Sequence, residues 1–194
     1  MIPTVAAAPD APQPQHRLWL AAALVVFALV SLTVGVIAKH NTLAPGLYPP
    51  SYLKLFFSDP IHLKVWLATA AVILACFQVL TAAHIYQRLR LPMGGAVGTV
   101  HRWSGRLAIL LTLPVAYHCI FLLGYSDTST RVQVHSLLGS IIYGAFIAKV
   151  LIVRGGDRFP GWVLPLAGGM LFAIMLGLWL TSSLWFFQNV GVGI

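Results

Sequence analysis

Acidic residues are almost missing from this sequence of 194 residues, which contains no glutamate and only four aspartates. Charged residues of both signs make up 8% of the chain, whereas soluble globular domains carry roughly 25%. Hydrophobic residues reach 59%, and the mean hydropathy is +0.87. The two cysteines, Cys76 and Cys119, lie in the middle of separate apolar segments, which argues against a disulfide-stapled secreted domain. The composition therefore predicts an integral membrane protein.

Five apolar stretches have about the 20 residues that a helix needs to cross roughly 30 Å of hydrocarbon. We expect transmembrane helices at 18–38, 61–83, 100–123, 132–153 and 162–187. The predicted fold class is all-α, a single five-helix membrane bundle over residues 17–194 that follows a disordered cytoplasmic tail at residues 1–16. These segments leave no space for a soluble flavin or nucleotide module, which would need on the order of 100 residues.

The Lys and Arg residues give the chain a formal net charge of +8. They stand at the ends of the apolar segments rather than along a solvent-facing stripe, which argues against nucleic-acid binding. The side of the N-terminus has the larger share: Arg17, Arg88, Arg90, Arg102, Arg106, Lys149, Arg154 and Arg158, against Lys39, Lys54, Lys64 and Arg131. The positive-inside rule then predicts a multi-pass protein of the cell inner membrane, with its N-terminus in the cytoplasm and its C-terminus outside.

Three local features are predicted at the segment ends. Ser58-Asp59-Pro60 is typical of a helix start, with a capping side chain and a proline in the first turn, and it places His62 in that first turn. The short link at residues 124–130 predicts that the third and fourth helices are antiparallel neighbours. Pro114 predicts a kink in the third helix.

Five histidines lie in or at the ends of three consecutive segments, where an ionisable side chain is a functional candidate. The second segment is flanked by His62 and His84, the third contains His101 and His118, and the fourth opens with His135. One metal cannot bind both His101 and His118, because 17 residues separate them by about 25 Å along a helix. The histidines therefore divide into an inner pair, His84 with His101, and an outer trio in which His62 and His118 compete to partner His135. Two such layers predict two haem sites, one above the other across the membrane.

Glycines and arginines near these histidines have two possible roles. Gly105 and Gly139 each follow a histidine by four residues, so they lie under the same helix face and leave space either for a flat macrocycle or for a closely packed helix. Arg102 and Arg106 flank His101 and can hold haem propionates through charge-assisted hydrogen bonds, besides setting the topology.

These motifs resemble a known group of membrane proteins. The runs in question are His101-Arg102-Trp103-Ser104-Gly105-Arg106, Ala116-Tyr117-His118-Cys119 and His135-Ser136-Leu137-Leu138-Gly139. They resemble the b-type haem core of the cytochrome b561 and ferric-reductase-like transmembrane families, and still more that of small bacterial five-helix proteins. The resemblance covers helices two to five. It implies two b haems in a helical bundle, with His101, His118 and His135 as iron ligands and with His84 or His62 completing the pairs.

The leading functional hypothesis is therefore electron transfer across the membrane through two bis-histidine haems. A cytoplasmic or quinol donor would face one side and an acceptor the other, as redox partner proteins, quinone or further subunits of a larger membrane complex. One alternative is a ferric reductase or quinol-oxidising subunit with a single haem. Another is a non-redox structural or transport subunit whose histidines bind Zn or Cu, although such sites need ligands clustered in one coordination sphere.

Overall fold

A computed structural model describes residues 14–41, 53–90, 92 and 94–191, and these residues form helices and connecting turns without any strand. Five helical segments are long and apolar enough to cross a membrane. The helices are α1 (Pro14–His40), α2 (Pro60–Ile85), α3 (Val97–Ala116), α4 (Thr130–Gly155), α5 (Val163–Trp179) and α6 (Trp185–Asn189), with short turns η1 (Gly94–Ala96) and η3 (Gly156–Arg158). Two stretches of π-helix, η2 (Tyr117–Leu123) and η4 (Leu180–Leu184), continue α3 and join α5 to α6.

The five predicted membrane segments are confirmed, and their limits shift by a few residues. The first helix begins at Pro14, so the prediction that residues 14–16 belong to a disordered tail is wrong. Residues 1–13, the rest of that predicted tail, lie outside the described residues. The last predicted segment is one membrane-spanning unit, Val163–Asn189, in which the α-helix gives way to π-helix and returns.

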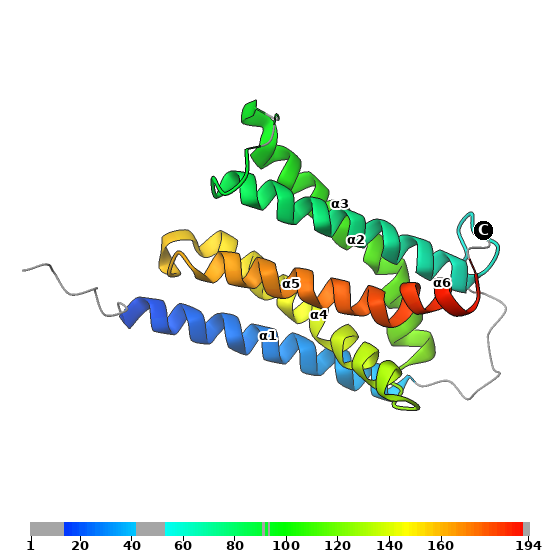
Figure 1. The fold of residues 1–194 in the computed structure, drawn as a ribbon. Coiled ribbons are helices and arrows are strands. Elements are labelled where there is room, and N and C mark those ends of the chain that lie inside the picture. Colours follow the sequence, from blue (N-terminus) through cyan, green and yellow to red (C-terminus); the bar gives the residue numbers. More distant parts are fainter. Residues whose placement is uncertain (1–13, 42–52, 91, 93, 192–194) are drawn as a thin grey trace, which may run out of the picture.

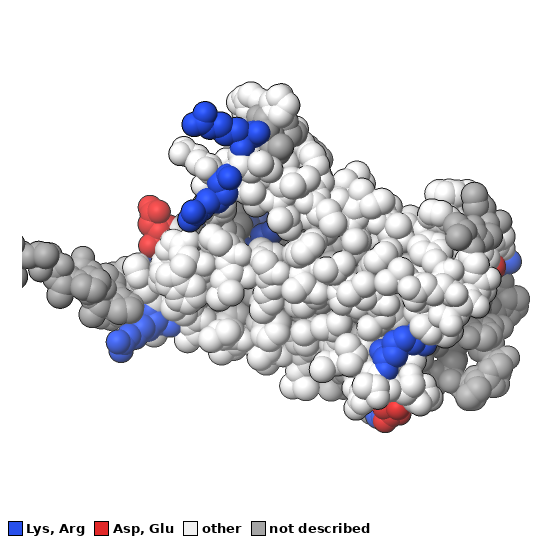
Figure 2. Space-filling model, in the orientation of Figure 1, with Lys and Arg blue, Asp and Glu red and all other residues white. Residues whose placement is uncertain are grey.

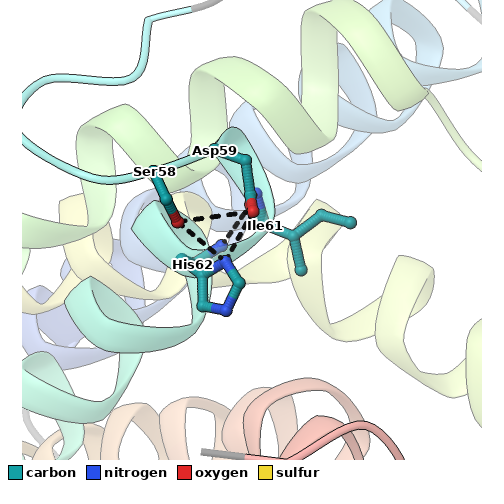
Figure 3. A network of polar contacts seen from close by, with 4 residues as sticks. All are labelled: Ser58, Asp59, Ile61 and His62. Carbon is teal, nitrogen blue, oxygen red and sulfur yellow. Dashed lines mark hydrogen bonds and ion pairs between the residues drawn. The ribbon is translucent and has the colours of Figure 1, made fainter. Parts of the chain in front are cut away.

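The predicted start of α2 is confirmed in detail. The Oδ1 atom of Asp59 accepts hydrogen bonds from the backbone N–H groups of Ile61 at 2.8 Å and His62 at 2.9 Å, and Pro60 occupies the first helical turn. The other carboxylate oxygen lies 2.6 Å from Nδ1 of His62, and Ser58 completes the network shown in Figure 3. Asp59 therefore both caps the helix and orients the His62 ring.

Removing this cap should destabilise the protein in a pH-dependent way. Burial alone would raise the pKa of Asp59, but the hydrogen bonds from His62 and Ile61 outweigh it and lower the pKa below its ordinary value of 3.8. The carboxylate thus adds stability that is complete above about pH 4 and is lost as pH falls through the lower folded pKa. We expect Asp59→Ala to lower the free energy of unfolding at pH 7 by about 1 kcal/mol, measured by thermal unfolding in detergent.

Two variants control this result. Asp59→Asn keeps a capping oxygen, so it should keep most of the stability while removing the acid dependence that Asp59 contributes. Asp127→Ala removes an exposed acid in the link between α3 and α4 and should change little. Equal stability of Asp59→Ala and wild type at pH 7 would contradict the assigned cap.

The helices pack in two close pairs joined by α5. The backbone of α2 packs on α3, that of α1 packs on α4, and α5 contacts both α2 and α4. Figure 1 shows α5 between the two pairs, with the start of α1 and the end of α6 at opposite ends of the bundle. Among the described residues, α3 and α4 are not a closely packed pair. These two predicted neighbours face one another across a gap, which the hydroxyl groups of Thr112 and Tyr143 span. The reason is that α4 packs on α1, which leaves space between α3 and α4.

Small residues allow α1 and α4 to approach closely. On α1, Ser31 and Gly35 are four residues apart, and on α4 Ser140 and Gly144 have the same spacing. A Cβ atom added to Gly144 would lie 2.6 Å from the backbone oxygen of Phe27, and one added to Gly35 would lie 3.6 Å from Oγ of Ser140. This small-xxx-small arrangement is the usual way in which membrane helices bring their backbones together.

Arginine and tryptophan pairs mark both ends of the bundle. At the end where α1 begins, the guanidinium group of Arg106 lies 4.9 Å from the ring centre of Trp103, and that of Arg158 lies 4.8 Å from the ring centre of Trp19. At the other end, the guanidinium group of Arg131 lies 4.1 Å from the ring centre of Trp185. We name the first of these the basic end, after Arg17, Arg88, Arg90, Arg102, Arg106, Lys149, Arg154 and Arg158. Figure 2 shows the wide uncharged middle between the two ends, as expected for a lipid-facing surface.

Candidate functional site

An apolar cavity lies between α2, α3, α4 and α5, in the space that opens because α3 and α4 do not pack together. Its volume is about 600 Å³, counting all space between the lining side chains and including the part open to the outside. The wall is formed by Ala68, Ala71, Val72, Thr112, Val115, Ala116, Cys119, Ile120, His135, Gly139, Ile142, Tyr143, Met175, Leu178, Trp179 and Ser182.

Polar contacts between helices tie the cavity walls together. The hydroxyl groups of Thr112 on α3 and Tyr143 on α4 lie 3.0 Å apart, across the gap between these helices. On the other side, the indole N–H of Trp179 donates to Oγ1 of Thr69 at 3.0 Å and so joins α5 to α2. The cavity is therefore bounded by hydrogen-bonded helices rather than by loops.

The histidine in this wall, His135, has its ring orientation set by α5 and η4. Its Nδ1 lies 3.0 Å from Oγ1 of Thr181, and that hydroxyl gives its single proton to the backbone oxygen of Gly177 at 2.7 Å. Thr181 can then only accept from His135, so Nδ1 carries the ring proton. The Nε2 atom is left with its lone pair, which is the form of neutral imidazole that binds a metal.

The same arrangement occurs at the basic end around His101. Its Nδ1 lies 2.8 Å from Oγ1 of Thr81 on α2, which donates to the backbone oxygen of Phe77 at 2.9 Å. Thr81 is fully buried. Because the threonine proton is already used, Nδ1 of His101 is again the protonated nitrogen and Nε2 the one with a lone pair.

The three other candidate histidines occupy different settings. His118 is 2% exposed in η2, and its Nδ1 lies 2.8 Å from the backbone oxygen of Pro114, which only accepts. His62 is held by Asp59 and meets the ring of Phe186 edge to face at 5.6 Å. His84 is half-buried in the last turn of α2, three residues after Thr81.

Four of the five histidines therefore share one tautomer, with a proton on Nδ1 that an acceptor holds. A metal-binding histidine usually donates its other ring N–H to such an acceptor, which fixes the ring and raises the basicity of the ligand nitrogen. No group of three or more His, Cys, Asp or Glu side chains that suits a metal ion occurs in the described part of the chain.

The two candidate glycines differ in what surrounds them. Gly139 lines the cavity, and an added Cβ would meet only Leu178, at 4.0 Å. At Gly105 an added Cβ would lie 2.9 Å from Oε1 of Gln78, whose amide nitrogen donates to the backbone oxygen of His101 and to Ser104. The space expected beside Gly105 for a macrocycle is filled by Gln78, because this side chain satisfies polar groups on α3.

Arg102 and Arg106 are both exposed at the basic end. Arg102 donates to Oγ1 of Thr99 at 3.3 Å, and Arg106 lies over Trp103. At the other end, Arg131 donates to the backbone oxygen of Thr181, the residue whose hydroxyl holds His135. The arginine nearest to the cavity histidine is thus on α4, rather than in the pair that flanks His101.

A family model matches residues 18–194, which is nearly the whole chain and all five membrane segments. The chain belongs to this family, DUF6529, a family of unknown function. No curated protein and no solved structure matches the chain. The function of this DUF6529 protein therefore has to be inferred from its own residues.

Sequence reasoning missed the residues that orient the histidines. Thr81, Thr181 and Gln78 are ordinary polar residues in apolar segments, and nothing in their spacing predicts which histidine each contacts. A weak signal was present, since a polar side chain within a membrane segment usually faces a partner. The sequence contains several other such threonines, so the partners become visible only once the helices are packed.

Proposed function

We propose that this DUF6529 protein is an electron-transfer protein of the membrane that binds b-type haem, with one haem in the cavity between α2, α3, α4 and α5. The observation that carries the proposal is His135, which stands in the cavity wall with its Nδ1 atom 3.0 Å from Oγ1 of Thr181, a hydroxyl that donates to Gly177. This contact favours the tautomer in which Nε2 has the lone pair. Haem between membrane helices is held by histidines in this form. When bound, a haem with two histidine ligands supplies one-electron transfer and leaves no open position on iron.

The cavity residues fit such a group. Most of the wall is apolar, which suits a flat macrocycle and keeps water away, and Gly139 leaves the surface one turn beyond His135 open. The roles of the protein side chains follow: His135 would hold the iron, Thr181 would fix the ring, and Arg131 beside Thr181 would add positive charge near the carboxylates of the group.

We assign His118 rather than His62 as the second ligand of this site. His118 is buried and precedes Cys119, which lines the cavity. His62 is already bonded to Asp59, and the nearest cavity residue on its helix, Ala68, lies six residues further along, about 9 Å. The assignment predicts that haem content depends on His118 and not on His62.

A second haem at the basic end, on His101 and His84, would complete a path across the membrane. His101 has the required tautomer, but Gln78 fills the space beside Gly105. This packing favours the alternative of a single-haem ferric reductase or quinol-oxidising subunit. The haem-to-protein ratio separates the two, since two haems per chain support the complete path and one supports the alternative.

On the positive-inside rule, we infer that the basic end faces the cytoplasm and that the protein lies in the cell inner membrane. A cytoplasmic reductant or quinol would then donate at that end, and the acceptor would lie outside. Vesicles test this directly: protein with bound haem should carry electrons from an impermeant reductant on one side to ferricyanide enclosed on the other. A rate equal to that of protein-free vesicles would contradict transmembrane transfer.

Thr181 gives a test of the tautomer argument that leaves the cavity shape intact. Thr181→Val removes the hydroxyl that accepts the His135 proton, and changes to such supporting residues typically weaken binding roughly 10–100-fold. We expect haem affinity to fall by an amount within that range, measured by titrating haem into the purified protein. Thr33→Val, on an exposed face of α1, is the matched control and should leave affinity unchanged. Equal affinities of Thr181→Val and wild type would contradict the role of Thr181.

A further inference from the structure

The face of α4 that lines the cavity continues to a lysine at the basic end. His135, Ile142 and Lys149 are spaced by seven residues, close to two helical turns, so all three lie on one face. His135 and Ile142 line the cavity. Lys149 is half-buried and lies about 21 Å from His135 along the helix. A lysine that faces the interior of a membrane bundle marks a binding site more often than a structural position.

His101 lies opposite Lys149 on α3. The steps from His101 to Ala108 and Val115 are again seven residues, with Ala108 in the core and Val115 in the cavity wall. Lys149 is within electrostatic reach of His101. By this spacing, His101 and Lys149 lie on the faces of α3 and α4 that border the gap between these helices.

This end of the bundle is hollowed and positively charged. Figure 2 shows a hollow between the end of the α2–α3 hairpin and the turn between α4 and α5, with Lys and Arg atoms on its rim and inside it. Asp157 in η3 is the acidic residue at this end of the described chain, and Lys149 makes no ion pair with any described residue. Because no described acidic side chain pairs with this half-buried ammonium group, an anion from elsewhere would stabilise it.

From these observations we propose that the hollow at the basic end binds the phosphate headgroup of an anionic phospholipid, with Lys149 as its contact on α4. The position is the level of lipid headgroups, because Trp19 and Trp103 stand at the same end, as interfacial tryptophans do. Basic pockets between membrane helices on the cytoplasmic side take anionic headgroups for this reason. The site does not depend on haem.

Native mass spectrometry of the delipidated full chain in detergent tests this, with phosphatidylglycerol and phosphatidylcholine as probes. Wild type should retain phosphatidylglycerol in preference, and Lys149→Met should lower that retention about fivefold, as expected for one cation near the headgroup layer. Lys149→Arg should keep most of it. Lys54→Met, an exposed lysine at the other end, should match wild type.

Three results would overturn the proposal. The first two are equal retention of both lipids by wild type and full retention of phosphatidylglycerol by Lys149→Met. The third is displacement of the lipid by millimolar inorganic phosphate, which would identify a free anion as the occupant. A thermal unfolding midpoint in phosphatidylcholine shows whether each variant folds. If Lys149→Met does not fold, Lys149→Gln and the salt dependence of wild-type retention decide, because a charge-based preference must weaken as salt rises.

Discussion

Replacing His135 with alanine should abolish haem binding in the cavity. The substitution removes the imidazole whose Nε2 lone pair stands in the cavity wall, and it leaves Thr181 without its partner. Loss of a ligand must weaken binding by more than the roughly 10–100-fold that follows from loss of a supporting residue. We expect the haem-to-protein ratio of the purified variant to fall by one haem per chain.

His40→Ala is the matched control, because His40 is exposed at the end of α1, far in sequence from every cavity residue. Its haem content should equal that of wild type. Imidazole added to His135→Ala should restore part of the haem spectrum, since the variant leaves a space of the right shape. An unchanged haem ratio in His135→Ala would show that the iron ligand lies elsewhere.

The second large effect is expected at Gly144, where the α1–α4 contact is tightest. A methyl group there would meet the backbone oxygen of Phe27 at 2.6 Å, and a backbone atom cannot move away without shifting α1. Overpacking of this kind usually destabilises by about 1–3 kcal/mol, and here a whole helix pair has to separate. We expect Gly144→Ala to lower the thermal unfolding midpoint clearly and to expose α1 to proteolysis.

Gly168→Ala makes the same chemical change in a different setting. An added Cβ at Gly168 has nothing within 4 Å, so the substitution should be neutral or slightly stabilising, because alanine favours a helix by roughly 1 kcal/mol over glycine. If both variants unfold at the same temperature, close packing of α1 on α4 does not contribute to stability.

Features that depend on short stretches of sequence were predictable. The five membrane segments follow from runs of apolar residues, and the start of α2 follows from Asp59 and Pro60, whose contacts are with residues two and three positions away. These predictions need no knowledge of which helices are neighbours. The structure therefore confirms them, and only the first and last residues of the helices shift by a few positions.

Features that depend on helix packing were not predictable to the same degree. The pairing of α1 with α4 leaves α3 apart from α4, although the link between the last two is short. That arrangement creates the cavity beside Gly139, while Gln78 fills the equivalent space beside Gly105. Gly105 and Gly139 thus have different surroundings although each follows a histidine by four residues. The difference comes from side chains on other helices, which are distant in sequence.

The sequence also contains two pairs of small residues at a spacing of four, Ser31 with Gly35 and Ser140 with Gly144. Small residues four positions apart are common in membrane helices, and such a pair does not identify the helix that it contacts. The structure joins the two pairs into one interface. The histidine ligand pairs remain predictions of the same kind, since their members lie on different helices.

The haem content of the purified wild-type protein decides whether this chain binds b-type haem. The full chain, expressed with an adequate haem supply and purified in mild detergent, should show the reduced-minus-oxidised absorption bands of b-type haem. At least one haem per chain is expected, and two if the His101 site is also filled. Protein that purifies folded and colourless, and that takes up no added haem, would contradict haem binding by this chain.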